Sequence, residues 1–356
     1  MRYVTASFPT GRFLVGILIA INGLQVSHRI DAQDIGKGPI SKSQQSQPVG
    51  EKSVTNTFGW HSDRPYPTLS VDEVLDRLTK STEELIQKKV VKGADELRKN
   101  LDRVTFSIAL IPALSKELST QEVYRRTSES VFLVAGMTKP TEKDADWKTS
   151  FSTAFVVHED GILSTSAHVF DHDDHDDAVV AMDIRGNVYP VVEVLAANRK
   201  ADTLLFRIGA KGLKPIPLGQ EVAPGSPVRV MGHPGDSFFF FSSGHLANYE
   251  RDEDNNSWLN VTADFGQGSS GGPVMDEAGN VIGQVSRTYT LYASGDSSNR
   301  SRRRSSLTQK ANDADAKEKN TKDADDESDP EAKKKSDPQM VFKACTPVSA
   351  IRALLK

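Results

Sequence analysis

The sequence predicts an all-β protein in which many short strands close into a barrel or a sandwich. From about residue 131 to residue 292, runs rich in Val, Ile, Phe and Thr are separated by clusters of Gly, Pro, Asn and Asp. This pattern is typical of barrels and sandwiches rather than of alternating β and α units. The runs expected as strands are 131–134, 155–157, 179–182, 204–208, 228–231 and 281–285.

A helical segment is expected before the strands, over residues 59–118. Ser70 and Glu73 have the spacing of a capping box, in which each side chain accepts a hydrogen bond from the other residue's backbone amide. We expect these helices either to dock on the main domain, which is the simpler interpretation, or to form an oligomer contact. The apolar residues at helical spacing are Val71, Val74, Leu75, Leu78, Leu85 and Ile86, followed by Leu97, Leu101 and Val104.

The main domain is expected to span residues 119–356. Ser119 and Glu122 predict a short helix at its start, residues 341–345 a strand, and residues 347–355 a terminal helix. Residues 294–339 are dense in charged residues and contain no aromatic residue, so they cannot bury enough surface to offset the cost of ordering. They are therefore predicted to be a disordered insertion within the folded domain.

The N-terminal residues predict an export signal. Arg2 and Arg12 precede the apolar run 13–21, and polar residues follow it. This predicts a signal peptide over residues 1–32 and a flexible linker over 33–58. Ile30 is bulkier than the small residue usual before a cleavage site, so an uncleaved anchor is the alternative. The expected location is the periplasm or the cell exterior, without a stable membrane span, because a span needs about 20 apolar residues.

The composition narrows the class of function. The 356 residues carry a formal net charge of −4, which gives no basic excess for nucleic acid, and we expect no nucleic-acid partner. Cys345 is the single cysteine, so no intramolecular disulfide can form. We expect Cys345 to be a buried small hydrophobe rather than a reactive thiol.

The chemistry is concentrated around Ser270, which lies in the run Gly-Gln-Gly-Ser-Ser-Gly-Gly-Pro-Val at 266–274. A Gly/Ser turn is the simplest interpretation, but glycines also permit a tight backbone with exposed amides around a nucleophile. The run also fits the nucleophile elbow of α/β-hydrolases, in which the histidine follows the serine. All eight histidines precede Ser270, so that arrangement is excluded.

Three ordered motifs resemble those of the trypsin-like serine proteases, especially the bacterial HtrA-like branch. Residues 165–169 read Thr-Ser-Ala-His-Val, residues 202–208 read Asp-Thr-Leu-Leu-Phe-Arg-Ile, and residues 268–273 read Gly-Ser-Ser-Gly-Gly-Pro. The order His, Asp, Ser is that of the chymotrypsin fold. The resemblance extends over roughly residues 120–356, less the insertion, and implies two antiparallel β-barrels. Further likeness lies in residues 152–155, 224–228 and 243–246.

The resemblance implies a serine endopeptidase that acts through an acyl-enzyme on protein or peptide substrates. Ser270 would be the nucleophile, His168 the general base, and Asp202 the carboxylate that orients it, in preference to Asp160 or Asp183. The backbone amides of Gly268 and Ser270 would form the oxyanion hole. No metal or other cofactor is needed. By analogy the process would be protein processing or quality control in the cell envelope, and a homo-oligomer is possible.

The residues that set specificity are less well defined. By resemblance, Ser286 and Thr288 would lie on the strand that pairs with substrate, and Thr288 would favour small aliphatic side chains. Asp264 lies six residues before Ser270, where trypsin keeps the acid that selects Lys or Arg. Of these two alternatives, we expect small aliphatic residues to be preferred. The chain departs from the HtrA-like pattern by ending soon after the protease domain, so we expect a member of that branch without a PDZ domain. We hypothesise that the insertion at 294–339 regulates the site or is itself cleaved near 302–304.

Two other functions remain open from the sequence. The first is a secreted binding protein on a protease-like scaffold. A degenerate scaffold of this kind usually loses a member of the triad, and all three members are present here. The second is a metal-dependent hydrolase, built on the Asp/His run at 171–177. That run lacks the spacing of a known metal site, and a solvated acidic loop is the simpler interpretation.

Overall fold

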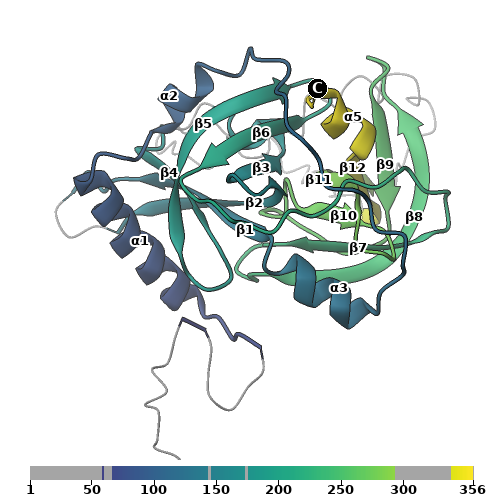
Figure 1. Ribbon diagram of the computed structural model, residues 1–356, viewed down its shortest axis with the longest axis horizontal. Helices are drawn as coiled ribbons and strands as arrows, with labels where there is room; N and C mark the ends of the chain where they lie inside the picture. The colour runs from purple at the N-terminus through teal and green to yellow at the C-terminus, as the bar shows by residue number, and fades with distance from the viewer. Residues whose placement is uncertain (1–57, 60–65, 143–145, 173–174, 293–337, 356) are drawn as a thin grey trace, which may run out of the picture. The chain divides into compact units, whose positions relative to one another are not determined.

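The computed structural model describes residues 58–59, 66–142, 146–172, 175–292 and 338–355 (Figure 1). The predicted signal peptide, nearly all of the linker, and most of the charged insertion lie outside these residues. None of the described helices is both long enough and apolar enough to cross a bilayer. Residues 338 and 339, which the sequence assigns to the insertion, belong to a strand.

The described strands form two closed antiparallel barrels, as the resemblance implies (Figure 1). The first has the strand order β1-β2-β3-β6-β5-β4 and the second the order β10-β11-β12-β9-β8-β7. The first barrel comprises β1 (Val131–Thr138), β2 (Lys148–His158), β3 (Ile162–Thr165), β4 (Ala178–Met182), β5 (Val188–Asn198) and β6 (Thr203–Ile208). The second comprises β7 (Pro227–Gly232), β8 (Phe240–Arg251), β9 (Ser257–Val261), β10 (Pro273–Met275), β11 (Val281–Tyr292) and β12 (Pro338–Pro347). Every run expected as a strand lies within one of these elements.

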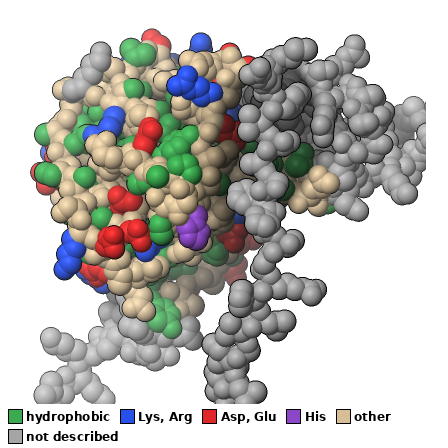
Figure 2. Space-filling view, turned by 90° about the vertical axis from the view of Figure 1, so that its right-hand side faces the viewer, with side chains coloured by type: hydrophobic (Ala, Val, Ile, Leu, Met, Phe, Trp, Pro, Cys, Tyr) green, Lys and Arg blue, Asp and Glu red, His purple; other side chains and the backbone are tan. Residues whose placement is uncertain are grey.

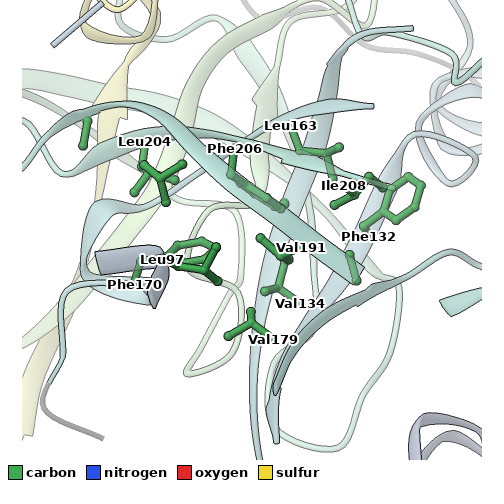
Figure 3. Packing of buried hydrophobic residues seen from close by; sticks show 14 of the residues in the cluster. Leu97, Phe132, Val134, Leu163, Phe170, Val179, Val191, Leu204, Phe206 and Ile208 are labelled. Carbon is green, nitrogen blue, oxygen red and sulfur yellow. The ribbon is translucent and has the colours of Figure 1, made fainter. Parts of the chain in front are cut away.

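The first barrel is filled by side chains that alternate along its strands (Figure 3). In β6, Leu204, Phe206 and Ile208 point into the barrel, whereas Leu205 packs on the outer side with residues of the second barrel. Both faces of the strand are therefore buried, which explains why its sequence is a nearly continuous apolar run. Each buried side chain of this size contributes about 1.5–3 kcal/mol.

Helix α1 (Val71–Gln87) covers the outside of β1 and β4. The predicted capping box at its start is present, with Ser70 and Glu73 bonded reciprocally. Val74 and Leu78 are fully buried and pack against apolar side chains of the two strands. This docking is the simpler of the two roles that the periodicity predicts.

The rest of the segment predicted as helical departs from that prediction. Helix α2 (Ala94–Arg98) has only five residues and places Leu97 against the core of the first barrel (Figure 3). Residues 103–118 contain no helix. They run as an extended strap that bonds Phe106 N–H to Leu354 O and Leu118 N–H to Glu277 O, and Val104 is exposed. Tertiary contacts along this strap outweigh the weak helical periodicity.

Two short helices flank the barrels. Ser119 caps α3 (Thr120–Thr127) by accepting from Glu122 N–H, but only this half of the predicted capping box forms. The Glu122 carboxylate instead binds Arg125 and Arg126, which lower its pKa to about 2. Helix α5 (Val348–Ala353) follows β12, as expected, and buries Val348 and Ile351 in the apolar cluster shared by both barrels.

Surface charge contributes little to holding this fold. On the face shown in Figure 2, basic, acidic and apolar side chains are interspersed among the described residues. Exposed ion pairs such as Lys80–Asp76, 3.9 Å apart, are worth at most about 1 kcal/mol. The barrels are therefore held mainly by their buried apolar side chains.

Candidate active site

His168 lies on a single 3-10 turn, η1 (Ala167–Val169), directly after β3 of the first barrel. The turn is fixed to the second barrel, because the buried Ser166 hydroxyl donates to Val285 O at 2.8 Å. The backbone N–H of His168 donates to Asp202 Oδ1 at 3.0 Å, and its Nδ1 lies 2.9 Å from Asp202 Oδ2. These contacts leave Nε2 as the ring atom available for chemistry, since the half-exposed side chain has no other hydrogen-bond partner within the described residues.

Asp202 precedes β6 and is held in an unusual backbone conformation. Its φ is +52°, in the left-handed region that Asp and Asn visit more readily than other non-glycine residues. Its carboxylate is largely buried and accepts bonds from His168 and from the Ser286 hydroxyl. Its backbone carbonyl accepts from the Gln284 side chain at 3.4 Å. Contacts from both barrels thus keep the carboxylate under the imidazole.

Histidine and aspartate shift each other's pKa in opposite directions. Burial disfavours the charged imidazole, but the charge and hydrogen bond of Asp202 outweigh burial and raise the pKa of His168. Burial likewise disfavours the carboxylate, but the charge of His168 and bonds from His168 and Ser286 lower the pKa of Asp202. The pair therefore favours an imidazolium beside an ionised carboxylate, the state that a general base reaches after taking a proton.

Ser270 lies on the loop that leads into β10 of the second barrel. Its hydroxyl donates to Ser286 O at 3.4 Å, a long hydrogen bond, and forms no hydrogen bond to His168. Ser286 also donates to Asp202, so this residue joins the serine loop to the His–Asp pair. The structure therefore links all three predicted residues through Ser286 and Asp202, and the serine hydroxyl donates to Ser286 O.

The amides beside Ser270 are free in the described part of the chain. Neither Gly268 N–H nor Ser270 N–H donates to a protein acceptor there, whereas Ser269 N–H binds Gly266 O and Gly271 N–H binds Val285 O. Gly268 has a φ of +92°, and a Cβ at this position would lie 2.3 Å from His233 O. Glycine is therefore required here by both backbone conformation and space. Two unpaired amides beside a serine can bind an oxyanion.

The residues predicted to set specificity lie in different environments. Ser286 is buried in a bulge of β11, and its side chain binds Asp202 instead of pointing to solvent. Thr288 is exposed on β11, opposite Lys343 of β12. The Asp264 carboxylate is exposed and forms an ion pair with Lys343. A charge that is already paired is poorly suited to select a basic substrate side chain.

The Asp/His run at 171–177 disperses its described side chains among separate partners. Asp171 binds Arg199, His175 binds Asp95, and Asp177 accepts from Lys139 N–H. Among the residues with described coordinates, no group of three or more His, Cys, Asp or Glu side chains is arranged to hold a metal ion.

Two other titratable side chains, Cys345 and His233, are fully buried. Cys345 is fully buried, as predicted, and burial raises its pKa. His233 is also fully buried, which lowers its pKa to about 3, and its Nδ1 accepts from Phe239 N–H at 3.0 Å. Phe239 is buried against His233, whereas Phe240 is exposed.

Sequence reasoning missed two groups that contact the serine loop. Thr153 of β2 donates its hydroxyl to Gly268 O at 2.8 Å, and its N–H to Ser270 O at 2.9 Å. Gly235, after β7, donates its N–H to Gln267 O at 2.8 Å. Thr153 lies in the motif at 152–155, but nothing in that motif predicts which loop it contacts.

Comparison with known proteins agrees with this geometry. Residues 152–283 match the family model described as a trypsin-like peptidase domain, and this range includes all three residues of the site. Serine protease HTRA1 of Xenopus laevis is 30% identical over 141 residues, covering 37% of this chain and 30% of that protein. A probable periplasmic DegP-like serine endoprotease of Pseudomonas fluorescens is 26% identical over 167 residues, covering 45% of this chain and 34% of that protein.

The chain thus spans about a third of the length of the curated relatives it matches. Among solved structures, an HtrA-type protease with a decapeptide aligns with a TM-score of 0.41 and 19% identity, over 51% of this chain and 61% of that one.

Proposed function

We propose that this trypsin-like peptidase domain, related to the HtrA and DegP-like serine proteases, is a serine endopeptidase that uses Ser270, His168 and Asp202. The observation that carries the proposal is the convergence at Ser270. One group is a histidine that is held by a buried carboxylate. The other is a pair of unpaired backbone amides. Both groups lie on elements that contact the same loop. This combination supplies a base, an orienting group and an oxyanion hole, which are the needs of a serine nucleophile.

The reaction begins with a turn of the Ser270 hydroxyl from Ser286 O toward His168. His168 Nε2 takes the hydroxyl proton as the serine oxygen attacks the peptide carbonyl, and the imidazolium then gives this proton to the leaving amine. The acyl-enzyme that results is hydrolysed when His168 activates a water molecule in the same way. Asp202 stays ionised throughout and stabilises the imidazolium.

The Gly268 and Ser270 amides stabilise the charge that develops on the carbonyl oxygen. Because they are unpaired in the resting protein, no internal hydrogen bond must break when the oxyanion forms. One such donor is worth about 3–4 kcal/mol of barrier.

The proposed substrates are proteins or peptides with a small aliphatic residue before the cleaved bond. The pairing of Asp264 with Lys343 supports this over a basic residue, because it neutralises the acid at the position where trypsin selects Lys or Arg. The DegP-like relatives are named as periplasmic, which supports an exported protein that processes other proteins of the cell envelope. The N-terminal export signal is part of this proposal.

Active-site labelling tests the proposal directly. We expect a fluorophosphonate probe to form a covalent adduct with the full chain, and mass spectrometry to locate it on Ser270. Ser270→Ala should abolish the adduct, whereas Ser269→Ala, at the buried neighbouring serine, should leave an adduct on Ser270. Absence of labelling in the wild-type chain, or labelling that persists in Ser270→Ala, would refute the proposed nucleophile.

A further inference from the structure

The two peptide groups that flank Gly268 are each held by a separate donor. On one side, Gln267 O accepts from Gly235 N–H at 2.8 Å, within the second barrel. On the other side, Gly268 O accepts from the hydroxyl of Thr153 at 2.8 Å, and Thr153 belongs to the first barrel. Because glycine has no Cβ, the peptide groups on either side of Gly268 can rotate more freely than those beside other residues. Its φ of +92° lies outside the range that most residues adopt. Its orientation is therefore set by these donors.

The Gln267 carbonyl shares a peptide group with the free Gly268 amide, so its orientation decides where that amide points. The N–H and C=O of a trans peptide point in opposite directions, and no described peptide bond is cis. With Gln267 O held by Gly235, the Gly268 N–H is directed to the opposite side, toward the proposed oxyanion hole. Thr153 holds the next carbonyl and so prevents Gly268 from rotating about its own bonds.

Thr153 also fixes the position of Ser270. Its backbone N–H donates to Ser270 O at 2.9 Å, and its own carbonyl accepts from the Thr165 hydroxyl at 2.7 Å. Thr165 ends β3, three residues before His168. A buried path of hydrogen bonds thus connects β3, the strand that precedes the turn of His168, to both residues of the oxyanion hole.

We infer that Thr153 is a positioning residue, whose hydroxyl keeps the Gly268 amide aimed at the oxyanion. The inference rests on the proposed function and names the residue that aligns its oxyanion hole. The side chain is fully buried, so its hydroxyl cannot exchange this partner for bulk water. Without the hydroxyl, Gly268 O would be a buried acceptor lacking its donor, and the loop would gain by rotating the carbonyl toward another partner.

The test compares Thr153→Val, which keeps the shape and removes the hydroxyl, with Thr153→Ser, which keeps the hydroxyl. The measurement is the saturation kinetics of fluorophosphonate labelling of the full chain, because the phosphonyl oxygen occupies the oxyanion hole. We expect Thr153→Val to lower the limiting labelling rate about 10- to 100-fold, below the effect of deleting a whole donor, with little change in the half-saturating concentration. Thr153→Ser should restore most of the rate.

Thr127→Val is the matched control. Thr127 is also buried, but its hydroxyl contacts Met275 Sδ of β10 at 3.2 Å and forms no hydrogen bond to residues 266–272 in the described part of the chain. This variant should label at the wild-type rate. Unchanged labelling of Thr153→Val, equal loss in Thr153→Ser, or equal loss in Thr127→Val would each overturn the inference while wild-type labelling upholds the proposed function. Absence of labelling in the wild-type chain would refute both.

Discussion

The carboxylate of Asp202 makes most of the charged and polar contacts that hold the base of the site. Its carboxylate binds the backbone and ring of His168 and the hydroxyl of Ser286, while burial keeps water from replacing these donors. The left-handed φ of +52° is a local cost of about 1–2 kcal/mol that places the carboxylate there. The hydrogen bonds to the carboxylate offset this conformational cost. The backbone of Asp202 thus places the carboxylate beside His168 at some expense of stability.

The pH dependence of labelling is predicted to follow the raised pKa of His168. The base must be neutral to accept a proton, so the labelling rate should rise with pH and level off above a pKa that exceeds the ordinary histidine value. In Asp202→Asn the charge that raises this pKa is lost, and the acid limb should move to lower pH. The rate on the plateau should fall about 10⁴-fold. The measurement is the second-order labelling rate as a function of pH.

Asp160→Asn provides the control for this pH profile. Asp160 lies in an exposed turn beside His158 and competes with Asp202 as a candidate in the sequence. Its replacement should leave both the plateau and the acid limb unchanged. An acid limb that stays in place in Asp202→Asn would contradict the assignment of that limb to His168.

The serine loop shows how tightly an element is constrained when two barrels pack around it. Gly268→Ala introduces a Cβ that would lie 2.3 Å from His233 O, at a φ of +92°. We expect the loop to shift and the labelling rate to fall by at least 100-fold, because the Gly268 amide leaves its position. The labelling rate and the unfolding temperature should both be measured.

Gly225→Ala separates the conformational cost from the steric one. Gly225 has a nearly equal φ of +91°, but a Cβ there would meet no atom within 4 Å. This variant should lose about 1–2 kcal/mol of stability and keep its labelling rate. If Gly268→Ala labelled as fast as Gly225→Ala, the oxyanion hole would not depend on this loop geometry.

The sequence predicted those elements whose signal is local. The β runs were found because burial on both faces makes them continuously apolar, and Ser70 was found because a capping box is encoded within four residues. The positions of His168, Asp202 and Ser270 were predicted from motifs in a fixed order. The structure brings these positions together, and their catalytic roles stay a proposal.

Features that depend on contacts between distant residues could not be predicted. Residues 103–118 follow the surface as a strap because Phe106 pairs with Leu355 and the Asn280 side chain binds Leu114 on both its N–H and C=O groups. The contact of Thr153 with Gly268 joins residues 115 positions apart. The direction of the Ser270 hydroxyl is likewise set by Ser286, on another strand.

At the scale of the whole described fold, buried polar groups connect the two barrels next to the site. Gln284 of β11 accepts from the Ser164 hydroxyl of β3 at 2.7 Å and donates to Asp202 O at 3.4 Å. Thr346 of β12 donates to Ala201 O at 2.7 Å. The shared apolar cluster around Leu205, Met231 and Ile351 supplies the area that holds the barrels together. The polar contacts fix the position of one barrel relative to the other, which an apolar interface alone would specify poorly.

Gln284 therefore couples barrel packing to the site, and a double-mutant cycle with Ser164 measures this coupling. Gln284→Met should lower the free energy of unfolding by about 1–3 kcal/mol, because the Ser164 hydroxyl stays buried without its acceptor. Adding Ser164→Ala removes the stranded hydroxyl, so the double variant should regain most of that loss. Urea unfolding gives the four free energies of the cycle, for the wild type, Gln284→Met, Ser164→Ala and the double variant, and losses that simply add would contradict the coupling. Gln284→Met should also lower the labelling rate, because the Asp202 backbone carbonyl loses the Gln284 donor that helps to place this residue. This loss should persist in the double variant, which separates the role of the glutamine in stability from its role in placing Asp202.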